Sequence, residues 1–177
     1  MRWTITLGIV VFLGLTVVVS AQMPMPTPAP EVKNFDFFNG KWTMEGDMKP
    51  GPMGPGGKFG GNETCEWMEG NFFLVCHNTF ESQAMGNGKG LAVMGYDSDK
   101  KVYVYNAFNS MGESERAEGT LSGDTWTWNS ESSMAGQPIK TRFVIKQTSP
   151  TSYDFKMEMA AAGAEMKTAM EGKATKH

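Results

Sequence analysis

The chain has 177 residues, with 16 basic and 19 acidic side chains and a net charge of −3 at pH 7. This mild acidity gives no support for binding to nucleic acid or to an anionic membrane surface, because both attract clustered basic side chains. The length is sufficient for a signal segment, a linker and one domain with its own core.

Residues 1–21 have the pattern of a secretory signal peptide. Arg2 precedes an uncharged apolar run from Ile5 to Val19, and Ala21 ends a stretch that a signal peptidase could cleave. We therefore expect an exported protein, periplasmic or extracellular in a bacterium, whose mature chain starts at Gln22. An uncleaved membrane anchor is the alternative, although a spanning helix needs about 20 apolar residues and this run is shorter.

Residues 22–34 predict a proline-rich tether, because prolines at alternate positions favour an extended polyproline conformation. Residues 35–177 should form the folded domain. This domain opens with the aromatic segment 35–38, which we expect to form one helical turn that closes one end of the sheet structure.

Alternation of apolar and polar residues fills the chain from Trp42 onwards and recurs about ten times. In the clearest run, Tyr153, Phe155, Met157 and Met159 share one face of a strand, with charged residues between them. Turn signals separate most of the runs, which indicates sequential strands joined by short loops. Such a meander removes its exposed edges by closing. The sequence predicts an all-β fold, a single up-and-down antiparallel β-barrel of about ten strands with a short N-terminal helical turn.

The two cysteines flank a predicted hairpin turn at Gly70-Asn71. If the strands pair across this turn, Cys65 lies directly opposite Cys76, within disulfide reach. We predict a disulfide between them, and two buried free thiols are the alternative. The same register turns His77 outward.

Several other segments have a predicted local structure. Residues 40–48 form the first strand, and the glycine-rich residues 49–61 form a long loop that could cover the barrel mouth. Residues 97–100 form a type I turn rather than a calcium loop. Residues 114–121 form a thin strand with both faces poorly buried. The last strand covers 165–173, although its alanines and Glu/Lys spacing also suit a helix.

Four short motifs resemble known families. Gly40-Lys41-Trp42 resembles the G-x-W that opens the first strand of calycins, which include lipocalins and fatty-acid-binding proteins. Three further motifs are residues 70–74, residues 94–97 with Lys101 and Tyr103 after them, and residues 149–153. All four motifs together resemble exported bacterial proteins of domain-of-unknown-function family 1579. The resemblance implies a calycin-like, lipocalin-like barrel with a hydrophobic ligand cavity and no agreed activity. In lipocalins a basic residue near the last strand covers the tryptophan, a place that Lys173 could take.

The inward-facing stripe provides the candidate ligand contacts. Methionine is abundant, with 15 in the chain. Three explanations fit this abundance of methionine. The residues fill the core, they form an adaptable pocket wall, or their M-x-M pairs bind Cu(I), and the first two explanations are preferred. The candidates are Trp42, Met44, Trp67, Leu74, Trp126, Trp128, Phe143, Tyr153, Phe155, Met157, Met159, Met166 and Met170.

No catalytic residue, cofactor or metal site is predicted. A nucleophilic triad needs a histidine beside a serine or cysteine, and His77 faces away from the interior. Glu113, Glu115 and Glu118 lack aromatic sugar platforms, and no cluster has zinc spacing. Related haem-binding barrels use a late histidine, which neither His77 nor His177 supplies. The expected function is non-catalytic binding of a small hydrophobic molecule, and the alternative is a structural or interaction protein of the cell envelope with a filled barrel.

Overall fold

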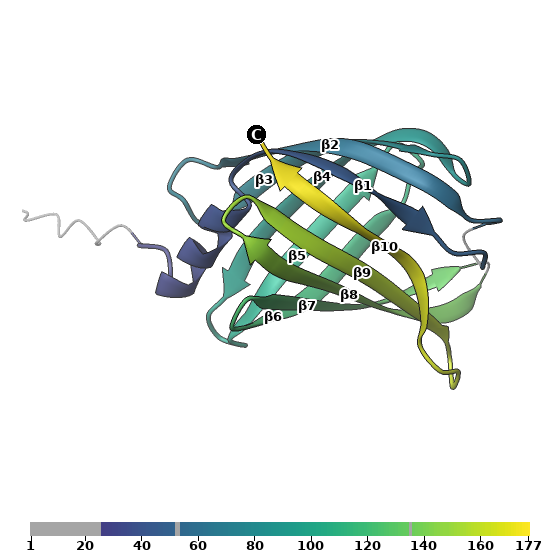
Figure 1. Cartoon of the computed structure of the whole chain (residues 1–177). Coiled ribbons are helices and arrows are strands. Elements are labelled where there is room, and N and C mark those ends of the chain that lie inside the picture. The colour runs from purple at the N-terminus through teal and green to yellow at the C-terminus, as the bar shows by residue number, and fades with distance from the viewer. Residues whose placement is uncertain (1–25, 52–53, 135) are drawn as a thin grey trace, which may run out of the picture.

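A computed structural model describes residues 26–51, 54–134 and 136–177 (Figure 1). The expected signal segment 1–21 and the first residues of the tether lie outside the described residues.

The described chain forms one 3-10 helix and ten strands, which close into an antiparallel barrel (Figure 1). Each strand pairs with its neighbours in sequence, and the last strand pairs with the first. The predicted all-β meander is therefore confirmed. The elements are η1 (Pro30–Phe37), β1 (Gly40–Met48), β2 (Gly57–Trp67), β3 (Leu74–Ser82), β4 (Gly86–Asp97), β5 (Val102–Asn109), β6 (Ser114–Ser122), β7 (Thr125–Met134), β8 (Gln137–Ser149), β9 (Ser152–Ala161) and β10 (Lys167–Lys176).

Helix η1 lies at one end of the barrel (Figure 1). It begins at Pro30, five residues before the expected helical turn, because proline suits the first turn of a helix, where its missing N–H is not needed. Phe35 at 0% exposure and Phe38 at 3% project from this segment into the core. The helical turn thus closes this end of the barrel, as the sequence predicts.

The cysteine hairpin has the predicted register. Cys65 pairs with Cys76 across β2 and β3, and the two form a disulfide. Gly70 and Asn71 in the turn both have positive φ, at 86° and 56°, which is the geometry that favours these two residue types in tight hairpins. His77 pairs with Thr64 and is exposed, as the predicted register requires.

The loop predicted over 49–61 is partly strand, because β2 begins at Gly57. The glycine-bearing segment from Gly86 likewise begins a strand, β4. Glycine weakens an isolated strand, but here the bare backbone is used for packing. A Cβ on Gly88 would collide with the Phe80 ring, which lies over it.

The strand β6 differs from the prediction that both of its faces are poorly buried. Its inner positions Ala117 and Gly119 are buried. The Trp128 ring of the neighbouring strand lies against Gly119, where a Cβ would collide with it. A large side chain from β7 therefore covers the inner face of a strand whose own side chains are small.

The last segment is a strand and not a helix, but it covers Lys167–Lys176 rather than 165–173. Met166 precedes this strand, so it lies outside the two-residue alternation that is expected to place it on the inner face with Met170. The pairing with β9 also shifts register between Thr168 and Met170. This irregularity breaks the strict two-residue period on which the prediction for Met166 rested.

Candidate functional site

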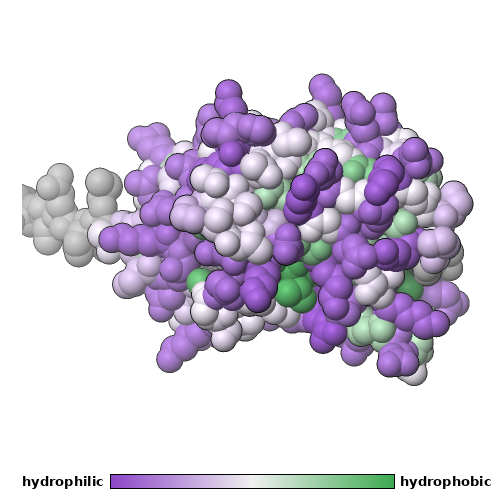
Figure 2. Space-filling model, viewed as in Figure 1, coloured by the Kyte–Doolittle hydropathy of each residue, from purple (hydrophilic) through white to green (hydrophobic). Residues whose placement is uncertain are grey.

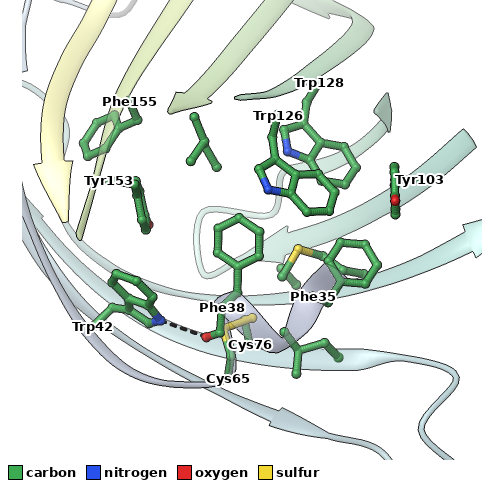
Figure 3. Close-up of a cluster of buried hydrophobic side chains, with 14 of the residues drawn as sticks. Phe35, Phe38, Trp42, Cys65, Cys76, Tyr103, Trp126, Trp128, Tyr153 and Phe155 are labelled. Atoms are coloured by element: carbon green, nitrogen blue, oxygen red, sulfur yellow. Dashed lines mark hydrogen bonds between the residues drawn. A yellow bond between two sulfur atoms is a disulfide. The ribbon is translucent and has the colours of Figure 1, made fainter. Parts of the chain in front are cut away.

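The barrel interior has two halves that differ in packing. We call the end closed by η1 the plug half and the opposite end the mouth half. In the plug half, the Phe35 ring stacks on Trp126 with centroids 5.2 Å apart, and Trp126 stacks on Trp128 at 5.8 Å (Figure 3). The Tyr103 ring meets Trp126 edge-on at 4.7 Å. This aromatic stack fills the plug half with the protein's own side chains.

Trp42 is held in the plug half by contacts from both ends of the chain. Its Nε1 donates a hydrogen bond of 2.8 Å to the Phe38 carbonyl (Figure 3). The Lys176 Nζ lies 5.4 Å from the Trp42 ring centroid and donates to the Phe37 carbonyl at 3.0 Å. The basic residue over the tryptophan is therefore Lys176. Lys173, which the sequence suggested, instead pairs with Glu45 outside the barrel at 3.0 Å.

Trp126 carries an unusual polar group in this core. Its side chain is 0% exposed, and its Nε1 is the one buried side-chain polar atom without a hydrogen-bond partner among the described residues. An unpaired buried donor costs about 1–3 kcal/mol. The packing of the aromatic stack outweighs that cost here.

The mouth half is lined differently. Most of its inward-facing apolar side chains keep some accessible surface, although Met48 at 3% and Ile139 at 6% are buried. The lining of the mouth half thus retains more accessible surface than the aromatic stack of the plug half. The apolar side chains that show this partial exposure are Met44, Phe59, Phe80, Tyr105, Ala107, Phe143, Met157, Met159 and Met170.

Glycines in the mouth half keep large side chains close to the wall. The Phe80 ring lies over Gly88, and the Phe59 ring packs where a Cβ of Gly46 would be. The bare backbone at these positions lets both rings pack directly against the sheet.

Glu63 lies at the middle of β2, between the two halves. It pairs with Trp42 on one side and Asn78 on the other, and it precedes the buried Cys65 by two residues, so its side chain faces inward. Burial raises the pKa of this carboxyl to about 7, and a hydrogen bond from Asn78 opposes the rise. The interior thus contains a carboxyl group that is close to half-ionised at neutral pH.

Two tyrosines share this region with Glu63. Burial raises the pKa of Tyr105 and of Tyr153, and the charge of Glu63 raises both further. Two phenols and a carboxyl, set in apolar surroundings, can orient a molecule through hydrogen bonds. The pKa values of the phenols lie above their ordinary range, so they remain neutral donors at physiological pH.

The disulfide lies beside this polar group. A carboxylate oxygen of Glu63 and the sulfurs of Cys65 and Cys76 all lie within 4.8 Å of one another. The two sulfurs are bonded to each other, so they cannot act as thiolate ligands. The three residues therefore do not form a metal centre.

A groove of about 780 Å³ lies on the outer face of β1, β2, β8, β9 and β10. Figure 2 shows this side of the molecule as mostly hydrophilic, with a small apolar area among the polar groups. Lys58 pairs with Asp47 at 2.8 Å and Lys49 pairs with Glu171. The charges of the groove are matched to each other, so it presents no strong field of one sign to a partner.

The predicted lining residues divide between the two halves. Trp42, Leu74, Trp126, Trp128, Tyr153 and Phe155 belong to the buried core. Met44, Trp67, Phe143 and Met170 are partly buried and pack against it. Met157 and Met159 keep accessible surface on the inner face of β9. Trp67 sits at the plug end, where its Nε1 donates to Asp36 at 3.0 Å.

A family model described as protein of unknown function (DUF1579) matches residues 27–176. The chain belongs to the DUF1579 family. Among solved structures, Rv2717c from M. tuberculosis resembles it with a TM-score of 0.58 and 12% identity, over 85% of this chain and 99% of that chain. EF1p2_mFAP2b bound to DFHBI resembles it with a TM-score of 0.46 and 11% identity, over 82% of this chain and 98% of that chain. A comparison with curated proteins found no match.

Membership of DUF1579 and the likeness to Rv2717c agree on the barrel, and at such low identity the likeness extends to the fold alone. Within the described residues of this DUF1579 chain, no helix has the length and apolar character needed to cross a membrane.

Sequence reasoning about this DUF1579 chain missed Glu63. The signal was present, because a residue two positions before an inward cysteine shares its face. Alternation marks the inner face by its apolar residues, and a carboxyl on the inner face of a barrel breaks that pattern. Asn78, its partner across the β2–β3 pair, breaks the pattern in the same way.

Proposed function

We propose that this protein is an exported, non-catalytic binding protein that takes a small apolar molecule into the mouth half of its barrel. The observation that carries the proposal is the contrast between the two halves. The aromatic stack of the plug half is buried, whereas most inward apolar side chains of the mouth half, apart from Met48 and Ile139, remain partly accessible. An apolar lining with a few convergent polar groups is the usual form of a small-molecule site.

Two features that suit an exported protein support the same proposal. A signal-like segment at 1–21 and a disulfide between Cys65 and Cys76 both suit an oxidising compartment outside the cytoplasm. We propose a periplasmic or extracellular location in a bacterium, where a carrier or scavenger of apolar molecules has a clear use.

A second candidate is a structural or interaction protein of the cell envelope. It is favoured by the density of the plug half, where Phe35, Trp42 and Trp126 are at most 1% exposed. A barrel that is filled throughout needs no ligand. The two candidates differ in one respect, namely whether the mouth half accepts a guest.

A fluorescence titration with N-phenyl-1-naphthylamine, a neutral apolar probe, distinguishes the candidates. Ala107 lies on the inner face of β5, so Ala107→Trp places an indole in the mouth half. Asn106→Trp adds the same group to the outer face of the same strand. We expect saturable one-to-one binding that Ala107→Trp weakens at least tenfold and Asn106→Trp leaves within twofold.

Circular dichroism and thermal melting of both variants establish that they remain folded. Absence of saturable binding to the unsubstituted protein would favour the structural candidate. Equal binding by the protein and both variants would place the probe outside the barrel and would also contradict the proposal.

A further inference from the structure

The inner wall carries acidic groups without basic partners. Across β2 to β7, the inward-facing positions hold two carboxylates, Glu63 and Glu115, and in this described part of the barrel they hold no lysine or arginine. Glu115 follows the ladder Cys65–Cys76–Ala92–Ala107 around the barrel, which fixes its inward direction. The interior is therefore acidic on this side.

Of the two carboxylates, Glu63 is the more buried, and within the described ranges it has no charged partner. Glu115 lies in an exposed position and accepts a hydrogen bond of 2.6 Å from the Ser130 hydroxyl. No ion pair among the described residues includes Glu63. A carboxylate inside a protein without a cation is unfavourable, because neither water nor a partner charge stabilises it fully.

The surroundings of Glu63 favour a positively charged partner. Asn78 hydrogen-bonds to the carboxyl, and the phenols of Tyr105 and Tyr153 lie near enough for its charge to act on them. A protonated amine supplies the missing positive charge and the donors that a carboxylate accepts. An anionic ligand would instead be repelled by both Glu63 and Glu115.

The apolar lining continues from Glu63 toward the mouth. On the same face of β2, Gly61 and Phe59 follow it, and Phe80 and Gly88 lie across the neighbouring strands. This arrangement suits a molecule with one charged end held at mid-barrel and an apolar body that extends toward the opening.

We propose that the ligand is an amphipathic amine whose ammonium group binds Glu63 at the middle of the barrel while its apolar body occupies the mouth half. This inference rests on the proposed function, because it names the chemical class of the guest. Glu63 acts as the anchor, Asn78 orients it, and the partly accessible methionines and phenylalanines cover the tail.

Calorimetric titration with three twelve-carbon probes below their micelle concentrations tests the inference. The probes are dodecylamine, 1-dodecanol and dodecanoate, which share a tail and differ in the charge of the head group. At pH 8, we expect dodecylamine to bind at least tenfold more tightly than 1-dodecanol, and dodecanoate at least tenfold more weakly than 1-dodecanol.

Glu63→Gln keeps the shape of the side chain and removes its charge. It should abolish the preference for the amine, so that dodecylamine binds the variant no more than twofold more tightly than 1-dodecanol does. Glu66→Gln, on the exposed face of the same strand, serves as the matched control and should retain the full preference. Thermal melting confirms that both variants are folded.

Different results would contradict ligand binding in the barrel and anchoring of the amine by Glu63. If none of the three probes binds, the proposed function itself is wrong. If 1-dodecanol and dodecylamine bind the unsubstituted protein with equal affinity, or if Glu63→Gln retains the preference for the amine, the barrel is a binding site but Glu63 is not the anchor.

Discussion

Glu63 determines much of the chemistry inside the barrel. It faces inward from the middle of β2, where it pairs with Trp42 on β1 and with Asn78 on β3. Burial raises the pKa of Glu63 to about 7 from an ordinary value of 4.5. A group shifted in this way links the stability of the fold to pH.

The sign of that linkage follows from proton binding. Between pH 4.5 and 7, the folded state retains the Glu63 proton while the unfolded state has released it, so a rise in pH favours unfolding. We expect the free energy of unfolding to fall through this window by up to about 3 kcal/mol on account of Glu63. Tyr105 and Tyr153 do not contribute, because burial moves their pKa values upward, away from this window.

Urea denaturation at pH 5, 6, 7 and 8 measures the effect. Glu63→Gln should show a flatter dependence than the unsubstituted protein and should be the more stable of the two at pH 8. Glu66→Gln should follow the unsubstituted protein. Parallel pH profiles for all three proteins would mean that Glu63 is not desolvated in the folded state.

At the scale of elements, the β2–β3 hairpin is specified most completely by its own sequence. A short turn with positive φ at Gly70 and Asn71 joins the two strands, and the register places Cys65 opposite Cys76. The disulfide then ties two strands that also carry Glu63 and Asn78. Turn, covalent bond and polar pair all depend on one register.

The disulfide closes a short loop, with a sequence separation of 11. Its loss should therefore lower the free energy of unfolding by about 2–3 kcal/mol. We expect this from the double substitution Cys65→Ala and Cys76→Ala, measured by urea denaturation. The unsubstituted protein, unfolded and refolded in dithiothreitol, should match the variant. Unchanged stability in both would show that the bond does not constrain the unfolded chain.

Local alternation predicts these elements well, and it fails where distant residues intervene. The first strand begins and ends at the predicted residues, and the cysteine register is as expected. The strand at Gly57–Gly61 could not be foreseen, because it depends on how the Phe59 and Phe80 rings pack against bare backbone. Lys176 rather than Lys173 covers Trp42, since that contact depends on how far β10 extends.

Local alternation also predicts which side chains face inward at the candidate site, but not how far each one is buried. The inward stripe on β9 is visible from sequence, and the sequence left open whether it is core or pocket wall. The structure divides it: Tyr153 and Phe155 are core, whereas Met157 and Met159 retain accessible surface. That division depends on the position of η1, which fills one end of the barrel and leaves the other to its own lining.

For the whole molecule, the important property is the difference between its two ends. Helix η1 and the aromatic stack around Trp126 close the plug half and provide a rigid base. Methionine and phenylalanine line the mouth half, and methionine adapts to guests of varied shape. This DUF1579 barrel thus combines a buried core and a methionine-lined mouth half, the proposed site, within one sheet.

Crystals pressurised with xenon test most directly whether the mouth half holds an apolar space, because xenon enters such spaces without needing a polar contact. We expect a xenon peak inside the barrel on the mouth side of Glu63, near Phe143 and Met157, and no peak within the aromatic stack of the plug half. An interior without xenon, with the side chains of the mouth half closed across the axis, would contradict a binding function for this barrel.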